Sequence, residues 1–348
     1  MKKILILLFA STLIFAQKQT SEKRYKEIAG RYGGNDGICL FEDGTYMLYG
    51  YATAVFGTYL FEKDYINFYP DKQELFMIFG SQNPVIGNSA RLYFSGFERD
   101  ETVVQFDQAK PQPVFNDDAN CFGSPYVYET KMKPSQIILS DLINGTWHQS
   151  KFEIPTEYND LAIVYNKPSR YEENFTGMVK SDGNSKMLTI SMYDRGFKKS
   201  NEDKNDNNWK EILEMKSQYS QDKEGSKNGI FFNRHYHNFP APDSSVYTFD
   251  KKTNQLISKN AKDNEAYFRD NQYNDDRYLR KYIKVVGQTN VDNSFDKNNI
   301  SPKSLFFTTC GEGSEKSYKY NGFVEYEHKN EPKELQQTTD LEPIPAPK

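Results

Sequence analysis

The sequence has 348 residues, with 37% hydrophobic and 15% aromatic side chains and a formal net charge of −4. The charges are scattered rather than gathered into a basic face, so nucleic acid is not an expected partner. The length exceeds what one small core usually holds, so we expect about two domains, and the aromatic content favours strands.

Residues 1–16 have the pattern of a secretory signal peptide. Lys2 and Lys3 form a basic start, and an uncharged apolar run follows up to Phe15. This run is shorter than the about 20 apolar residues that span a bilayer, and no second run of that kind follows. We therefore expect cleavage near Ala16 and a periplasmic or secreted mature protein, with no membrane insertion.

Residues 17–133 are expected to form an N-terminal antiparallel β-domain, a barrel or a sandwich. Short apolar or alternating runs are separated by turn residues, of which Asp43-Gly44 is the clearest hairpin turn. A polar, proline-rich stretch then leads to a predicted domain boundary near 131–136. The expected strands of this domain are 37–41, 45–49, 55–61, 65–69, 75–79, 91–97, 102–106 and 126–130.

The ribbon from 41 to 61 is apolar on both of its faces. Tyr46, Leu48, Phe56 and Leu60 alternate with neighbours that are equally apolar. A sheet with one face in water would carry polar residues on that face, so both faces must be covered. We expect these four residues to line a ligand cavity, and the alternative is an interior that is simply filled by large side chains.

Three short motifs in this region resemble those of bacterial lipocalin-like domains, the small calycin-type barrels. They are Gly30 with Tyr32, Asp-Gly-Thr-Tyr at 43–46, and Gly-Thr-Tyr at 57–59. The resemblance covers about 28–106, and Tyr32 stands where the family usually has tryptophan. It implies a barrel that is wide enough for one small apolar molecule, and it implies no catalytic residue.

Residues 134–328 are expected to form a second β-rich domain with long polar insertions. Its expected strands are 137–142, 161–165, 187–193, 230–239, 246–249 and 304–309. Two segments, 209–216 and 276–286, have apolar residues at helical spacing and are expected as short helices, although 276–286 also alternates as a strand. Polar stretches at 195–208 and 218–227 are expected as loops, and the tail 329–348 as disordered.

Three cysteines, at positions 39, 121 and 310, allow one internal disulfide in an exported protein. Cys39 with Cys121 is the expected pair, because both lie in the first half of the chain. The alternative is that Cys39, Cys121 and Cys310 are all free thiols in buried positions.

Two histidines in one short segment, His235 and His237, are the candidate metal ligands. Residues two apart on a strand share a face, so both imidazoles could reach one zinc ion. A third ligand would have to come from His148, Glu153 or Asp243. The alternative is a pair of half-exposed histidines, because His-x-His lacks the spacing of known zinc sites.

A second metal candidate is the segment 203–214. It places Asp203, Asn205, Asn207 and Glu214 at the first, third, fifth and twelfth positions of a calcium-binding loop. Asn208 occupies the sixth position, where such loops have glycine, so a solvated polar loop is the alternative.

No motif of a catalytic nucleophile, a phosphate-binding loop or a zinc protease occurs in the sequence. We therefore expect an exported, non-catalytic β-protein of the cell envelope that binds a small apolar or carbohydrate ligand. One alternative is a metal-dependent hydrolase that uses His235 and His237. Another is a structural scaffold that has no small ligand.

Overall fold

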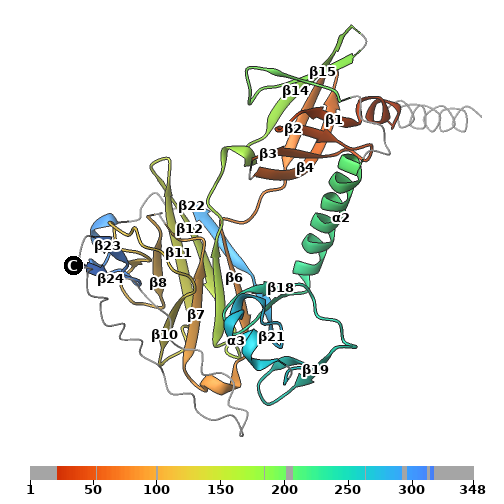
Figure 1. Cartoon of the computed structure of the whole chain (residues 1–348). Coiled ribbons are helices and arrows are strands. Elements are labelled where there is room, and N and C mark those ends of the chain that lie inside the picture. Colours follow the sequence, from red (N-terminus) through yellow and green to blue (C-terminus); the bar gives the residue numbers. More distant parts are fainter. Residues whose placement is uncertain are drawn as a thin grey trace, which may run out of the picture.

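The computed structural model describes residues 22–316 except 52, 99–100, 184, 201–206, 263, 292–295 and 312–313. In this part of the chain strands dominate, and they form two lobes joined by a long helix (Figure 1). The predicted mainly β class is therefore confirmed. The predicted signal peptide and the tail 329–348 lie outside the described residues.

The upper lobe in Figure 1 is an eight-stranded antiparallel sheet. The sheet nearly closes into a barrel, because the Ser200 amide donates to the Arg31 carbonyl at 2.8 Å and Tyr32 forms a β-bridge with Lys199. A helical segment over 22–28 precedes it. The strand order is β1 (Gly30–Gly33), β2 (Gly37–Leu40), β3 (Thr45–Gly50), β4 (Thr53–Glu62), β5 (Tyr65–Pro70), β14 (Phe175–Asp182), β15 (Ser185–Ile190) and β16 (Gly196–Lys198).

Large side chains pack the inside of this barrel. Phe68 and Phe175 stack with ring centroids 4.5 Å apart, and Tyr46 meets both rings edge-on. The Tyr59 hydroxyl donates to the Phe41 carbonyl at 2.8 Å, so this buried phenol is hydrogen-bonded. The buried members are Ile28, Tyr32, Ile38, Leu40, Tyr46, Leu48, Tyr59, Ile66, Phe68, Phe175, Leu188, Ile190 and Phe197.

The outer face of β2, β3 and β4 is covered by helix α2 (Asn207–Lys227). The ring of Phe56 stacks on that of Tyr219 with centroids 4.1 Å apart. Helix α2 therefore covers the outer face at β2, β3 and Phe56, but Leu60 further along β4 is 55% exposed, so the predicted cover of both faces is confirmed only in part. The residues that pack together here are Cys39, Phe41, Met47, Tyr49 and Phe56 from the sheet side and Trp209 and Ile212 from the helix.

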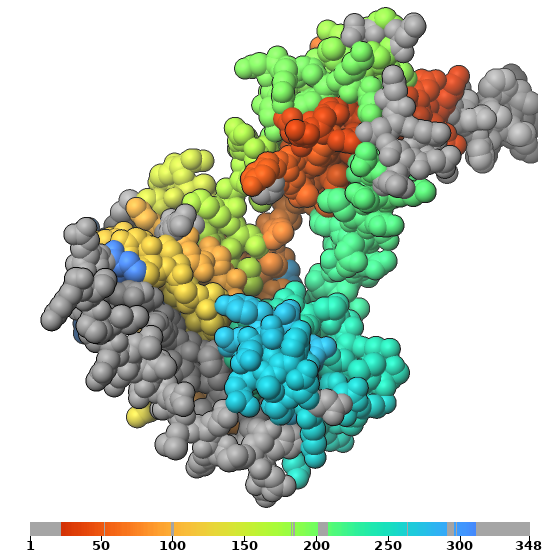
Figure 2. Space-filling model, viewed as in Figure 1, coloured from red at the N-terminus to blue at the C-terminus, as the bar shows by residue number. Residues whose placement is uncertain are grey.

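Helix α2 is 21 residues long and reaches from the barrel to the lower lobe. Tyr219 donates to the Asp71 carboxylate at 2.8 Å, and Lys223 pairs with it at 2.7 Å. The helix predicted at 209–216 is thus confirmed, whereas the loop predicted at 218–227 is wrong. Figure 2 shows α2 as a separate column with an opening beside it. No helix in the described part of the chain combines the length and apolar character needed to span a bilayer.

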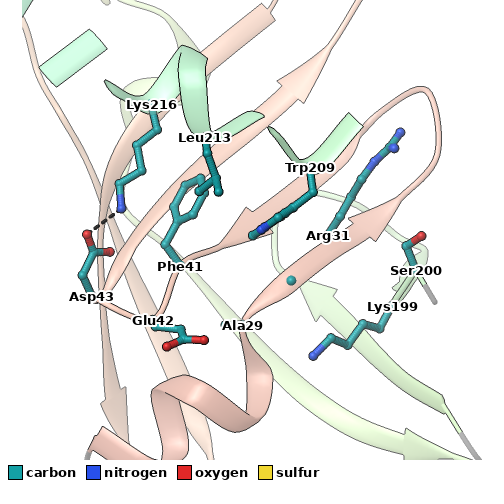
Figure 3. A pocket seen from close by; sticks show the side chains of 11 residues that line it. Ala29, Arg31, Phe41, Glu42, Asp43, Lys199, Ser200, Trp209, Leu213 and Lys216 are labelled. Atoms are coloured by element: carbon teal, nitrogen blue, oxygen red, sulfur yellow. Dashed lines mark hydrogen bonds and ion pairs between the residues drawn. The ribbon is translucent and has the colours of Figure 1, made fainter. Parts of the chain in front are cut away.

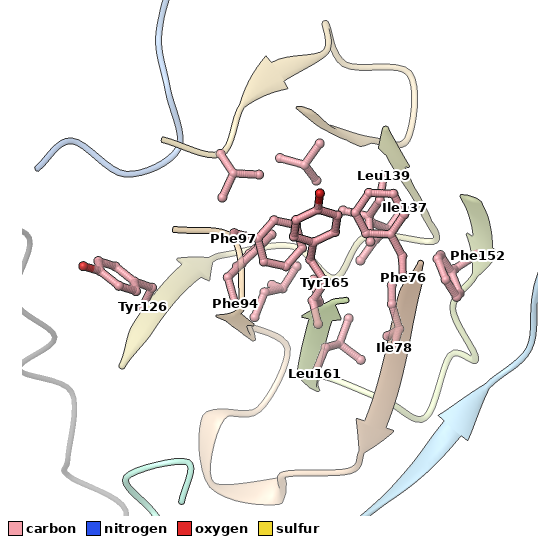
Figure 4. Close-up of a cluster of buried hydrophobic side chains, with 14 of the residues drawn as sticks. Phe76, Ile78, Phe94, Phe97, Tyr126, Ile137, Leu139, Phe152, Leu161 and Tyr165 are labelled. Carbon is pink, nitrogen blue, oxygen red and sulfur yellow. The ribbon is translucent and has the colours of Figure 1, made fainter. Parts of the chain in front are cut away.

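The lower lobe contains two sheets that pack face to face. The larger has the order β10 (Tyr126–Thr130), β7 (Ala90–Ser95), β13 (Asp160–Tyr165), β6 (Phe76–Ser81), β21 (Tyr278–Val285), β17 (Ile230–Phe232) and β18 (Asn238–Phe239), and β20 (Gln255–Ser258) with β19 (Tyr247–Asp250) extends from β21. The smaller has the order β22 (Gly287–Val291), β12 (Thr146–Glu153), β11 (Gln136–Ile143), β8 (Val103–Phe106) and β9 (Gln112–Pro113). One buried cluster unites side chains of both sheets, such as Phe94 and Leu161 with Leu139 and Phe152 (Figure 4).

Short elements complete the lower lobe and the connections. They are α3 (Glu265–Asp270), the 3₁₀ turns η1 (Pro84–Ile86), η2 (Arg170–Glu172), η3 (Gln272–Asn274) and η4 (Lys297–Asn299), and the hairpin of β23 (Thr309–Gly311) and β24 (Ser314–Lys316). The strand predicted at 304–309 is reduced to an isolated bridge at Phe306 before β23 begins.

Strand pairing crosses the domain boundary predicted near 131–136. Strand β8 pairs with β11, and β7 pairs with β13, so strands from both sides of that boundary share a sheet. The barrel also draws on both predicted domains, because the chain leaves it after Pro70 and returns at Phe175. The predicted division into 17–133 and 134–328 therefore does not follow the sheets.

Two further predictions are corrected. The segment 276–286 is not a helix but strand β21, which lies between β6 and β17 and is therefore surrounded by apolar neighbours. The disulfide joins Cys121 to Cys310, while Cys39 is buried between the barrel and α2. Cys39 faces the helix from the middle of a strand, so it cannot meet a cysteine of the other lobe.

A buried carboxylate, Asp160, joins several strands of the larger sheet. It accepts hydrogen bonds from Arg91 at 2.6 Å, Asn83 at 2.8 Å and Tyr236 at 2.8 Å, and Arg280 lies 3.3 Å away. Burial alone would raise the pKa of Asp160, but the two guanidinium groups outweigh it and the pKa is lowered. The charge therefore stays on the carboxylate inside the lobe.

We predict that Asp160→Asn destabilises the protein strongly, because it leaves two buried guanidinium groups without their counter-charge. The expected loss is about 3–5 kcal/mol in the free energy of unfolding, measured by urea titration. Asp36→Asn is the matched control, since Asp36 pairs with Arg195 at the surface and should cost about 1 kcal/mol or less. Equal losses for the two variants would contradict the prediction.

Candidate functional site

A cavity of about 550 Å³ lies between the barrel wall and the first half of α2. Figure 3 shows its walls: the start of β1 and the turn after β2 on one side, α2 above, and the chain that follows β16. The volume falls within the range of about 300–1,000 Å³ that is typical of small-molecule sites. The cavity is thus large enough for a compact ligand.

One side of the cavity is apolar. Phe41 and Trp209 lie with ring centroids 5.8 Å apart, and Leu213 projects beside them from the next turn of α2 (Figure 3). Leu213 is 43% exposed, which is unusual for a leucine next to two aromatic rings. Trp209 and Leu213 therefore present a partly exposed apolar surface next to the Phe41 ring, which is itself buried.

An ion pair closes one end of the cavity. The Lys216 ammonium lies 2.5 Å from the Asp43 carboxylate and 4.3 Å from the centre of the Phe41 ring. Partial burial would raise the pKa of Asp43, but the hydrogen bonds from Lys216 and Thr45 lower it overall. Asp43 therefore carries its charge and neutralises that of Lys216 at this end.

Basic side chains lie at the other end, where the barrel closes. The stem of Lys199 crosses Gly30 so closely that a Cβ atom at Gly30 would be 2.7 Å from Lys199 Cε. The Lys199 ammonium donates to the Glu27 carbonyl at 3.4 Å. Arg31 donates to the Tyr49 hydroxyl at 2.9 Å, which fixes its guanidinium against the barrel. Two basic side chains therefore lie at this end, and the Glu42 carboxylate also lines the cavity.

The four residues predicted to line a ligand cavity do not lie together. Tyr46 and Leu48 belong to the packed barrel interior, whereas Phe56 packs against α2 and Leu60 is 55% exposed. The register explains the split, because Met47 pairs with Phe56 and so places Phe56 on the outer face. None of the four lines the cavity described here.

The candidate metal ligands His235 and His237 lie in the turn between β17 and β18, not on one strand as predicted. The Asn233 side-chain oxygen accepts from the backbone amides of both, at 2.9 and 3.0 Å. Arg234 Nε lies 3.2 Å from His235 Nε2 and donates to it, while His237 packs against the Tyr273 ring. Nε2 of His235 therefore already accepts a hydrogen bond.

No group of three or more His, Cys, Asp or Glu side chains that could hold a metal occurs within the described ranges. His148 belongs to β12 in the smaller sheet, and Glu153 and Asp243 are exposed. The calcium-loop candidates Asn207 and Glu214 belong to helix α2. Asp203 and Asn205 lie outside the described residues.

We predict that His235 makes stability depend on pH. Burial lowers its pKa to about 4, against about 6.5 in an unfolded chain. The unfolded chain thus binds an extra proton between these values, so the free energy of unfolding should fall by up to about 3 kcal/mol as the pH drops from 6.5 to 4. Urea titrations across this range should show a smaller slope for His235→Gln, whose amide oxygen can still accept from Arg234. An unchanged slope would contradict the prediction.

Comparison of the chain with protein-family models, with curated proteins and with solved structures finds no match.

Proposed function

We propose that this protein is a non-catalytic binding protein whose site is the cavity between the barrel and α2. The ligand we propose is a small amphiphilic molecule with an apolar body and an anionic end. The observation that carries the proposal is the arrangement of one apolar side, formed by Phe41, Trp209 and Leu213, with the cationic Lys199 across the cavity. We further propose that it acts after export, in the periplasm or outside the cell.

The apolar side of the cavity supports an apolar ligand body. Covering the exposed parts of Trp209 and Leu213 removes apolar surface from water, which contributes about 25 cal/mol per Å². The Lys216–Asp43 pair is neutral as a unit, so it does not attract an ionic group to that end. The anionic end of the ligand is therefore expected beside Lys199.

The packed barrel interior favours this outer site over a site inside the barrel. The lipocalin-like resemblance implies a ligand within the barrel, but the rings of Tyr46, Phe68 and Phe175 occupy that space. The alternative of a metal-dependent hydrolase has no supporting observation among the described residues. A scaffold without a small ligand is the alternative that the following experiment separates from binding.

We predict that dodecanoate binds in this cavity and changes the fluorescence of Trp209. The chain has two tryptophans, and Trp147 is buried in the lower lobe, so a Trp147→Phe variant isolates the signal of Trp209. A saturable change in emission is the expected result. Dodecyltrimethylammonium, with the same chain and the opposite charge, should bind at least tenfold more weakly because of Lys199.

Matched variants on one helix control for nonspecific effects. Leu213→Gln should weaken dodecanoate binding about tenfold, because Leu213 lines the cavity. Met215→Gln should not, because Met215 is similarly exposed, at 47% against 43%, but does not line it. Lys199→Gln should reduce the preference for the anionic chain. Absence of saturable binding would reject the proposed function and favour the scaffold.

A further inference from the structure

A second cavity, of about 690 Å³, lies where the last turns of α2 meet the β17–β18 hairpin of the lower lobe. Helix α2 contributes to both cavities, but with different turns, and no residue lines both. Any ligand held here would therefore bind independently of the proposed amphiphile.

The helix side of the second cavity is polar. Gln218 lies three and four residues before Gln221 and Asp222, and these lie four and three residues before Gly225, which places all four on one face of α2. Gln218 Nε2 donates to Asp222 Oδ1 at 2.8 Å, and this bond orients the carboxylate along the wall. The absence of a side chain at Gly225 leaves that face open toward the hairpin.

The hairpin side of the second cavity is aromatic. Phe231 pairs with Phe239 across β17 and β18, so both rings lie on the same face of the hairpin, and both are half-buried. Phe232 points to the opposite face and packs in the buried cluster with Tyr282. The two outer rings are thus held on a hairpin that the buried Phe232 anchors.

This combination of groups selects a class of ligand. Asp222 is the charged residue among those that line the cavity, and the Lys281 ammonium lies 5.9 Å from the centre of the Phe231 ring, so the site has no excess of positive charge for an anion such as phosphate. The amides of Gln218 and Gln221 present donors and acceptors, and the carboxylate accepts from hydroxyl groups. Aromatic faces such as those of Phe231 and Phe239 attract the partly positive C–H edges of a sugar ring. We propose that this cavity binds a neutral saccharide.

The test is titration of the full mature chain with four soluble hexasaccharides: cellohexaose, maltohexaose, chitohexaose and mannohexaose. Saturable heat in calorimetry with at least one of them is the expected result. Hexagalacturonate, which carries a carboxylate on each ring, should bind at least tenfold more weakly than the best neutral sugar because it faces Asp222. If none of the four neutral sugars binds, or if hexagalacturonate binds best, the proposal is overturned.

Variants then place the sugar in this cavity. Gln221→Ala, a change on the helix surface, and Phe239→Ala should each weaken binding at least tenfold. Glu224→Ala is the matched control, because Glu224 lies on the same turns of α2, pairs with Lys227 and does not line the cavity. Leu213→Gln, which changes the first cavity, should leave sugar binding unchanged. Loss of amphiphile binding and loss of sugar binding can therefore be observed separately. Sugar binding that survives both cavity variants would overturn the assignment.

Discussion

The structure depends on one constraint: strands β2, β3 and β4 are apolar on both faces. The side chains of the inner face are buried because the sheet curls and nearly closes, which brings Tyr46 and Tyr59 into a common core. The same sheet cannot bury the apolar side chains of its outer face, so a separate element has to cover them. Helix α2 supplies it, with Trp209 and Ile212 against Phe41 and its neighbours. The curvature of the barrel and the position of the helix thus both follow from one alternating pattern of apolar side chains.

The same constraint explains why α2 carries both proposed sites. The apolar contacts of the helix with the barrel extend from Trp209 to Tyr219, whose ring stacks on Phe56, and Tyr219 and Lys223 make the last polar contacts through Asp71. Beyond that point the helix is polar and is supported at its far end by the lower lobe. A straight helix cannot follow a curved sheet along its whole length, and one cavity opens between the barrel and the helix next to Trp209. The other lies next to Gln221, where the last turns of the helix meet the β17–β18 hairpin.

Local features of the fold could be predicted from the sequence, and long-range ones could not. The expected strands up to position 165 are present with bounds within a few residues, because alternation and turn residues act locally. The apolar residues of segment 276–286 fit both helical and strand spacing. Its place between β6 and β17 makes it a strand. The polar half of α2 has helix-forming residues but no apolar stripe, so periodicity misses it. That β5 pairs with β14, and Cys121 with Cys310, depends on contacts across about a hundred residues or more, which no local pattern encodes.

The candidate site escaped prediction for a related reason. Alternate residues of a strand point to opposite faces, and this rule assigns the faces correctly within β3. Phe56 comes after a turn, so its face is known only from its pairing with Met47, which places it on the outer face. The repeated Gly-Thr-Tyr serves two different needs: Gly44 has a φ of +79° in a turn, whereas Gly57 makes room for the Tyr46 ring, which a Cβ atom would approach to 2.7 Å. The tyrosines of that motif therefore both pack against Phe68 inside the barrel. The aromatic surface that a ligand can reach belongs to Trp209, at the start of α2, next to the buried Phe41 ring.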